Sequence, residues 1–134
     1  MTELFNPQFT DAELGRLSVL GLAHVGDGVY ELLTRTMLCS RGLGKVNNLH
    51  RATVELVKAP AQAKAMEKIL PLLTEQEAAV YRRGRNTKTH AAPNRATASE
   101  YHAATGLETL FGWLYLKGER ARLSELYAYI MEEN

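Results

Sequence analysis

The chain has 134 residues, of which 46% are hydrophobic and 23% charged, and its formal net charge at pH 7 is +1. This length suits one domain that buries about 65% of its unfolded surface, and the composition argues against disorder. No apolar run is long enough to span a membrane, and the first ten residues lack a secretion signal. We therefore expect one domain over 1–134 in the reducing cytoplasm, with the single cysteine, Cys39, as a small core residue.

Capping residues and apolar periodicity predict helices throughout and no convincing strand. The first predicted helix begins at Thr10 or Asp11, with leucines 14, 17 and 20 on its apolar side, and the second covers 29–38 and ends near Arg41–Gly42. The third covers 49–58 behind an asparagine cap at Asn47 or Asn48, the fourth covers 60–70, and the fifth runs from Thr74 to about Gly84. The sixth runs from Thr97 to Leu116 with a brief break near Thr105–Gly106, and the last covers 120–131. Two starts carry capping boxes, Thr74 with Glu77 and Thr97 with Glu100. The predicted fold is all-α, a single compact helical domain.

The segment Leu107–Leu116 is apolar nearly all round and includes Trp113. Such a helix is normally buried on every side. In a chain this small we expect part of that burial to come from a second copy, which predicts a dimer. The same helix also motivates an alternative, a small protein-interaction domain.

The stretch Gly21–Glu31 places an acid, Asp27, between Gly26 and Gly28 in an otherwise apolar helical pattern. One helical face carries Leu20, His24, Asp27, Tyr30 and Glu31. Each glycine costs a helix roughly 1 kcal/mol relative to alanine, and one use for that cost is the close approach of another backbone or a ligand. Asp27 is then either a surface acid or a carboxylate that is paired or holds a cation.

A second acid, Glu108, lies in the later apolar helix. Two carboxylates from different helices can share Mg²⁺, which prefers hard oxygen ligands and keeps several of its waters. An ion so held polarises a phosphodiester and activates water. Spacing does not show that Asp27 and Glu108 meet, so two separately satisfied acids remain the alternative.

No acid occurs between Glu77 and Glu100, which makes this segment locally basic. Its cationic residues are Arg82, Arg83, Arg85, Lys88 and Arg95, with His90. Arginine pairs two phosphate oxygens at once, and Asn86 can hydrogen-bond a phosphate or ribose. Residues 86–96 lack periodicity and are predicted to form a loop. The segment is either a phosphate-binding surface or a solvated basic loop without a ligand.

Leu22–Glu31 (LAHVGDGVYE) resembles the signature helix of the ribonuclease III catalytic domain. Further blocks agree with it in order: Asn48–His50, Arg82–Lys88, Ala104–Glu108 and Tyr115–Leu116. Together they are similar to the small branch of that family, Mini-ribonuclease III, which lacks the double-stranded RNA-binding domain of larger members.

The resemblance implies a Mg²⁺-dependent endoribonuclease that cuts double-stranded RNA as a homodimer. It further implies maturation of large-subunit (23S) ribosomal RNA precursors, 5′-phosphate and 3′-hydroxyl ends, and a large-subunit ribosomal protein as a candidate partner. Its RNA-binding residues would be Arg82, Arg83, Arg85, Asn86 and Lys88, with Lys45, Arg51 and Arg95 secondary. Duplex is favoured over single-stranded RNA because aromatic side chains for stacking bases are missing there.

The family has four acids in each catalytic site, and Asp27 and Glu108 match two of them. They are therefore the predicted catalytic and metal-binding residues. Ala23 and Thr105 stand at the other two positions, a reduced pattern that the small branch shares. Fewer charged ligands hold Mg²⁺ more weakly and leave open whether one or two ions bind. The missing acids also motivate an alternative, an inactive RNA-binding module in ribosome assembly.

Three more residues have two interpretations each. Glu31 is a supporting acid near Asp27 or an ordinary surface residue. His50 orients active-site groups or contacts RNA, or it is structural. His24 stands where the family often has an aromatic that inserts into the partner subunit. It is predicted to be a packing or dimer contact, and the alternative is a direct role in metal binding or proton transfer.

Overall fold

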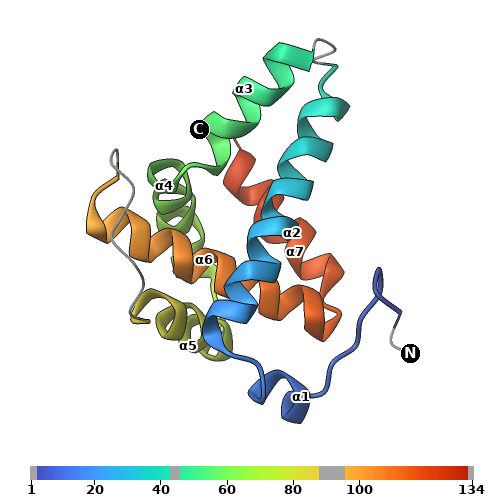
Figure 1. Cartoon of the computed structure of the whole chain (residues 1–134), viewed down its shortest axis with the longest axis vertical. Coiled ribbons are helices and arrows are strands. Elements are labelled where there is room, and N and C mark those ends of the chain that lie inside the picture. The colour runs from blue at the N-terminus through green and yellow to red at the C-terminus, as the bar shows by residue number, and fades with distance from the viewer. Residues whose placement is uncertain (1–2, 43–45, 88–95, 133–134) are drawn as a thin grey trace.

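The computed structural model describes residues 3–42, 46–87 and 96–132, and the regular elements in these ranges are all helical (Figure 1). They are α1 (Asp11–Gly15), α2 (Val19–Ser40), α3 (Val46–Val57), α4 (Ala59–Ile69), a short 3₁₀ turn η1 (Leu70–Leu72), α5 (Glu75–Arg85), α6 (Ala98–Lys117) and α7 (Arg120–Met131). The all-α prediction is confirmed. Within the described ranges, no helix has the length and apolar character needed to cross a bilayer.

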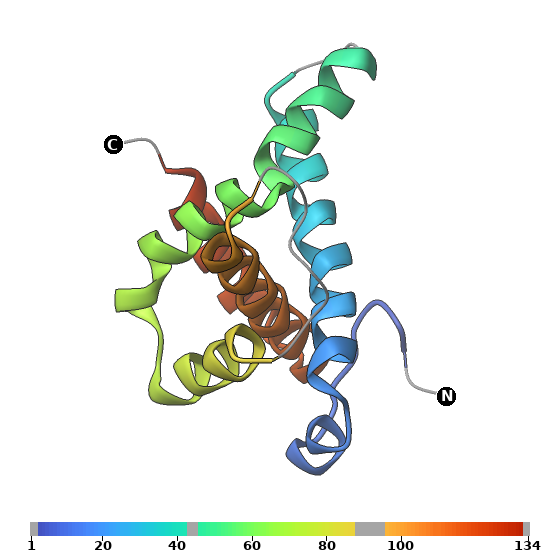
Figure 2. The ribbon, with the colours of Figure 1, turned by 60° about the vertical axis from the view of Figure 1, so that its left-hand side comes forward.

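Helix α6 lies at the centre of the molecule, and α2, α4, α5 and α7 pack against it (Figure 2). The C-terminal half of α2 and the whole of α3 extend beyond this bundle side by side. Leu107, Leu110 and Phe111 have no exposed surface, and Trp113 is 7% exposed. Helices of the same chain therefore bury this segment. The expectation that a second copy contributes part of this burial is therefore not needed to explain it, and the homodimer stays a prediction.

The crossing of α2 over α6 depends on two glycines. A Cβ atom on Gly26 would lie 1.6 Å from the carbonyl oxygen of Glu108, and one on Gly112 would lie 1.9 Å from that of Leu22. The two backbones therefore touch directly, and any side chain at either position would force the helices apart. A Cβ on Gly28 would meet nothing within 4 Å. The expected close approach of another backbone is thus confirmed for Gly26. At Gly28 no backbone of the described residues comes close, and the approach of a ligand there stays a prediction.

Local capping signals are confirmed at both predicted capping boxes. Thr74 accepts a hydrogen bond from the backbone N–H of Glu77 at 3.1 Å, and the carboxylate of Glu77 accepts one from the N–H of Thr74 at 2.9 Å. Thr97 and Glu100 form the same arrangement at the start of α6. Gly118, with φ of +92°, ends α6 in the left-handed conformation that favours glycine.

Two predicted helix starts differ from the structure. The predicted second helix starts at Val29, but α1 ends at Gly15 and α2 already begins at Val19. Ser18 caps α2 by accepting from the N–H of Gly21 at 2.9 Å. Leu20 then lies in the exposed first turn of α2 and is 50% exposed. Helix α3 includes Asn47 and Asn48, which had been predicted as caps. An asparagine in a helix interior costs less than about 0.7 kcal/mol relative to alanine. The packing of α3 on α2 outweighs this cost, so the helix includes both asparagines.

The predicted break near Thr105–Gly106 is wrong, because α6 is continuous there. The hydroxyl of Thr105 donates to the carbonyl of Tyr101 at 3.0 Å, so it is satisfied inside the helix. Gly106 makes room for a neighbouring ring, since a Cβ on it would lie 2.5 Å from Cε1 of Tyr81 on α5. This glycine serves packing between helices and does not interrupt one.

Gly26→Ala should lower the free energy of unfolding by about 3 kcal/mol or more, because the added methyl overlaps the backbone of α6. Gly28→Ala is the matched control in the same helix. It should be neutral or stabilise by up to about 1 kcal/mol, since its methyl meets open space and alanine favours helix. Urea unfolding followed by circular dichroism measures both. Equal effects of the two substitutions would contradict this account of the crossing.

Candidate active site

The glycine crossing sets the position of two acids. Asp27 follows Gly26 on α2, and Glu108 is the α6 residue whose carbonyl lies against Gly26. Asp27 is exposed and Glu108 half-buried. Burial first, and then the neighbouring charge of Asp27, raises the pKa of the Glu108 carboxyl to about 8. The two carboxyl groups therefore lie side by side, an arrangement that residue spacing had left open.

A third side chain, Gln62 in the first turn of α4, contacts this pair. Its Nε2 donates to the backbone oxygen of Val57 at 2.8 Å and lies 3.4 Å from Oε2 of Glu108. An N–H donor favours the ionised carboxylate, so Gln62 acts to lower the pKa of Glu108 against the two larger effects. Sequence reasoning missed Gln62. Its position as a polar residue between alanines in the first turn of a helix is the one signal that could have drawn attention to it.

The donor set fits a hard divalent cation. Asp27 and Glu108 offer carboxylate oxygens, the ligand type that Mg²⁺ prefers. Neither Ala23, which is buried, nor Thr105, whose hydroxyl is engaged within α6, supplies a further carboxylate. In the part of the chain that the structure describes, no three His, Cys, Asp or Glu side chains converge. An ion at this pair would thus have only two acidic ligands from these residues.

The supporting residues lie outside this contact. Glu31 forms a surface ion pair with Arg35 at 3.2 Å, as an ordinary surface residue does. His24 is exposed on α2, where a contact with a second copy remains a prediction. His50 lines a small pocket between α2 and α3 together with Arg35 and Cys39. The prediction of Cys39 as a core residue is wrong: it is exposed, whereas its neighbour Leu38 faces the core.

The basic residues lie in the last turn of α5. Arg82, Arg83 and Arg85 are exposed in its last turn, where positive charge favours a helix C-terminus, and Asn86 caps it. A Cβ on Gly84 would lie 2.3 Å from Oγ1 of Thr109. The last turn of α5 therefore packs on α6 at Thr109, the residue that follows Glu108 in the chain, and Arg83 lines a small pocket with Asp11 and Trp113. Of the remaining candidates, Arg51 is exposed on α3, and the others, Lys45, Lys88, His90 and Arg95, lie outside the described residues.

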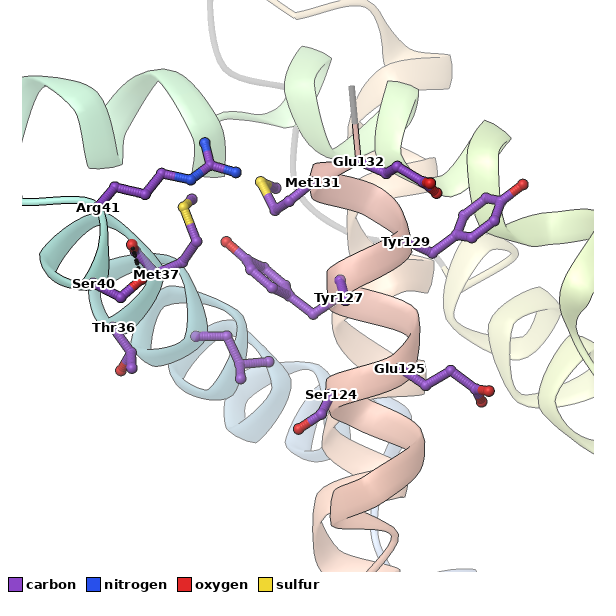
Figure 3. Close-up of a pocket in the computed structure, with 12 residues that line it drawn as sticks. Thr36, Met37, Ser40, Arg41, Ser124, Glu125, Tyr127, Tyr129, Met131 and Glu132 are labelled. Atoms are coloured by element: carbon purple, nitrogen blue, oxygen red, sulfur yellow. Dashed lines mark hydrogen bonds between the residues drawn. The ribbon is translucent and has the colours of Figure 1, made fainter. Parts of the chain in front are cut away.

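A larger concavity lies elsewhere. A groove of about 900 Å³ separates the C-terminal half of α2 from α7. In Figure 3 the side chains of Met37, Arg41, Tyr127 and Met131 point into it. The hydroxyl of Tyr127 donates to Thr34 at 2.7 Å and fastens the two helices together. Neither acid of the pair lines this groove, so a substrate would reach Asp27 from the open surface of α2.

The chain matches the model of one protein family, described as the ribonuclease III domain, over residues 20–119. This segment contains both acids and the basic turn of α5. A solved structure of a protein from Fusobacterium nucleatum has the same fold, with a TM-score of 0.78 and 28% sequence identity over 87% of this chain and 93% of that one.

Curated relatives are similar over most of their length. A protein of Symbiobacterium thermophilum is 50% identical over 110 residues, which cover 82% of this chain and 85% of its own. One from Clostridium tetani is 40% identical over 92% of this chain and 83% of its own, and one from Enterococcus faecalis 42% identical over 88% and 91%. All three are named Mini-ribonuclease 3.

The raised pKa of Glu108 predicts a pH dependence of stability in metal-free protein. The native state keeps a proton that the unfolded state releases between about pH 4.5 and pH 8. The stabilisation from this group is therefore full below pH 4.5 and lost as pH rises to about 8. Urea unfolding in chelator across this range should show stability falling with pH in the native protein.

The Glu108→Gln variant should remove that slope, and Asp27→Asn should only reduce it, because burial is the larger cause of the shift. Parallel pH profiles for the native protein and Glu108→Gln would show that Glu108 titrates normally.

Proposed function

Because the chain belongs to the ribonuclease III family, in its Mini-ribonuclease 3 branch, and is an endoribonuclease, we propose that it hydrolyses double-stranded RNA with Mg²⁺ held between Asp27 and Glu108. The observation that supports this is the contact of the two carboxyls across the glycine crossing of α2 and α6. Residues 20–119, which match the ribonuclease III family, lie within the single catalytic domain that we expect to span residues 1–134.

Each side chain has a distinct part in this proposal. When bound, the Mg²⁺ would act as a Lewis acid on the scissile phosphate and lower the pKa of an attacking water. Asp27, exposed on α2, faces the incoming strand. Glu108 must first release the proton that its raised pKa retains in the free protein, and the N–H of Gln62 helps to stabilise the resulting charge. The products would carry 5′-phosphate and 3′-hydroxyl ends.

The basic end of α5 is the proposed RNA contact. Arg82, Arg83 and Arg85 with Asn86, and Lys88 beyond them, would bind phosphate and ribose groups along the duplex. Packing of this turn against Thr109 of α6, the helix that also carries Glu108, supports a strand that contacts both the arginines and the carboxylates. Most of its binding energy would be electrostatic and therefore sensitive to salt.

We propose a homodimer in which each subunit supplies one site near one strand and His24 contacts the partner. Two basic surfaces together would then bind the duplex. The substrate that we favour is the 23S ribosomal RNA precursor in the cytoplasm, with a large-subunit ribosomal protein as a candidate partner.

One structural observation favours a second candidate, an inactive RNA-binding module in ribosome assembly. Ala23 is buried and apolar, and Thr105 is satisfied within its own helix, so neither substitutes for a missing carboxylate. This candidate predicts RNA binding without turnover at any Mg²⁺ concentration. The cleavage experiment below separates it from the enzyme.

Asp27→Asn and Glu108→Gln should each reduce cleavage of a long RNA duplex in Mg²⁺ by roughly 100-fold or more, the effect of losing several kcal/mol of metal-dependent stabilisation. Circular dichroism should show both variants folded. Glu31→Gln is the matched control, since it makes the same change in a surface ion pair of α2 and should cleave normally. Near-normal cleavage by Asp27→Asn would remove this residue from the site.

Arg83→Ala and Arg85→Ala should weaken duplex binding uniformly across sequences and each reduce the slope of log affinity against log salt by about 1. Arg120→Ala on α7, another exposed arginine, is the control and should leave the slope unchanged. Binding is measured by fluorescence anisotropy in calcium or chelator, over a series of salt concentrations. An unchanged slope in both α5 variants would place the RNA on another surface.

A further inference from the structure

Gln62 is a buried polar side chain that joins three parts of the fold. It lies on α4, is 2% exposed, and binds both the last residue of α3, Val57, and the α6 carboxylate of Glu108. The Val57 carbonyl can only accept a hydrogen bond, so the atom 2.8 Å from it must be the amide nitrogen. The orientation of the amide is thereby fixed, and Glu108 faces an N–H donor.

The same side chain carries an unpaired oxygen. Oε1 of Gln62 is buried without a hydrogen-bond partner among the described residues. A buried acceptor left unpaired is costly, and an apolar side chain of similar volume at this position would remove it. Packing alone therefore does not account for glutamine here.

The alternatives at this position would each lose the contact with Glu108. A glutamate would set an acceptor against the Val57 carbonyl and against the Glu108 carboxylate. Methionine, of similar length, would pack in the same space but donate no hydrogen bond. Glutamine is the residue of this length that supplies N–H donors without adding charge.

We propose that Gln62 is a positioning residue, whose amide N–H holds the Glu108 carboxylate beside Asp27 in the orientation in which both acids bind one divalent cation. The inference rests on the proposed function and adds a residue that touches neither RNA nor the ion. Partners of this kind, which orient a metal ligand, typically contribute 10–100-fold to metal affinity or activity.

The test compares Gln62→Met with Gln8→Met in the full chain. Gln8 is exposed and lies near Gly118 at the far end of α6, so it receives the same chemical change away from the pair. Mn²⁺ titration of RNA-free protein, followed by electron paramagnetic resonance of the free ion, measures binding directly. Gln62→Met should bind Mn²⁺ about 10-fold or more weakly and lose kcat with little change in KM, whereas Gln8→Met should match the native protein.

A second measurement uses native protein and holds even where Gln62→Met does not fold. In ¹⁵N NMR spectra, addition of Mg²⁺ should shift the side-chain amide signals of Gln62 and leave those of Gln8 unchanged. The shift should disappear in Glu108→Gln. Unaltered Mn²⁺ affinity in folded Gln62→Met, or no Gln62 shift with saturating Mg²⁺, would overturn the proposal.

Failure of the proposed function has a different signature. Native protein that neither binds Mn²⁺ nor cleaves duplex would overturn both the function and the role of Gln62. If the native protein binds Mn²⁺ and cleaves duplex, and the Gln62→Met variant behaves in the same way, only the role of Gln62 is overturned.

Discussion

The direct backbone contact between α2 and α6 is the constraint on which the rest of the molecule depends. Gly26 and Gly112 each lie against a carbonyl of the opposite helix, with no side chain between them. Because a helix has a fixed rise and rotation per residue, this contact also fixes which neighbouring side chains face each other. Asp27, adjacent to one glycine, is thereby placed against Glu108, whose own carbonyl forms the contact.

The carboxyl pair makes that crossing electrostatically unfavourable. Burial first, and the neighbouring charge of Asp27 second, raise the pKa of Glu108, so the two acids do not both ionise easily at this site. A divalent cation is the ligand that would relieve it, since it favours both ionised forms. The unpaired oxygen of Gln62 is a second local cost at the same place. Local costs that persist in a fold tend to concentrate at functional sites.

Helix α6 also organises the basic surface. Gly84 of α5 lies against Thr109, and Tyr81 fills the space left by Gly106, so the last turn of α5 is held on the helix that carries Glu108. The groove between α2 and α7 is separate from the carboxyl pair, and neither Asp27 nor Glu108 lines it. One buried helix thus carries Glu108 and also holds the basic turn of α5 in place.

Local interactions made much of this predictable from the sequence. Capping boxes need only a threonine and a glutamate three residues apart, and a closing glycine needs only its own φ, so the starts of α5 and α6 and the end at Gly118 were correct. Asp27, Glu108 and the basic turn were predicted as site residues from local motifs, and their function stays a prediction. Tertiary packing decided the rest: that Asp27 meets Glu108, that α6 continues through Thr105, that Cys39 is exposed, and that Gln62 contacts Glu108. Each of these depends on which helix lies against which, and residue spacing within one helix carries no information about that.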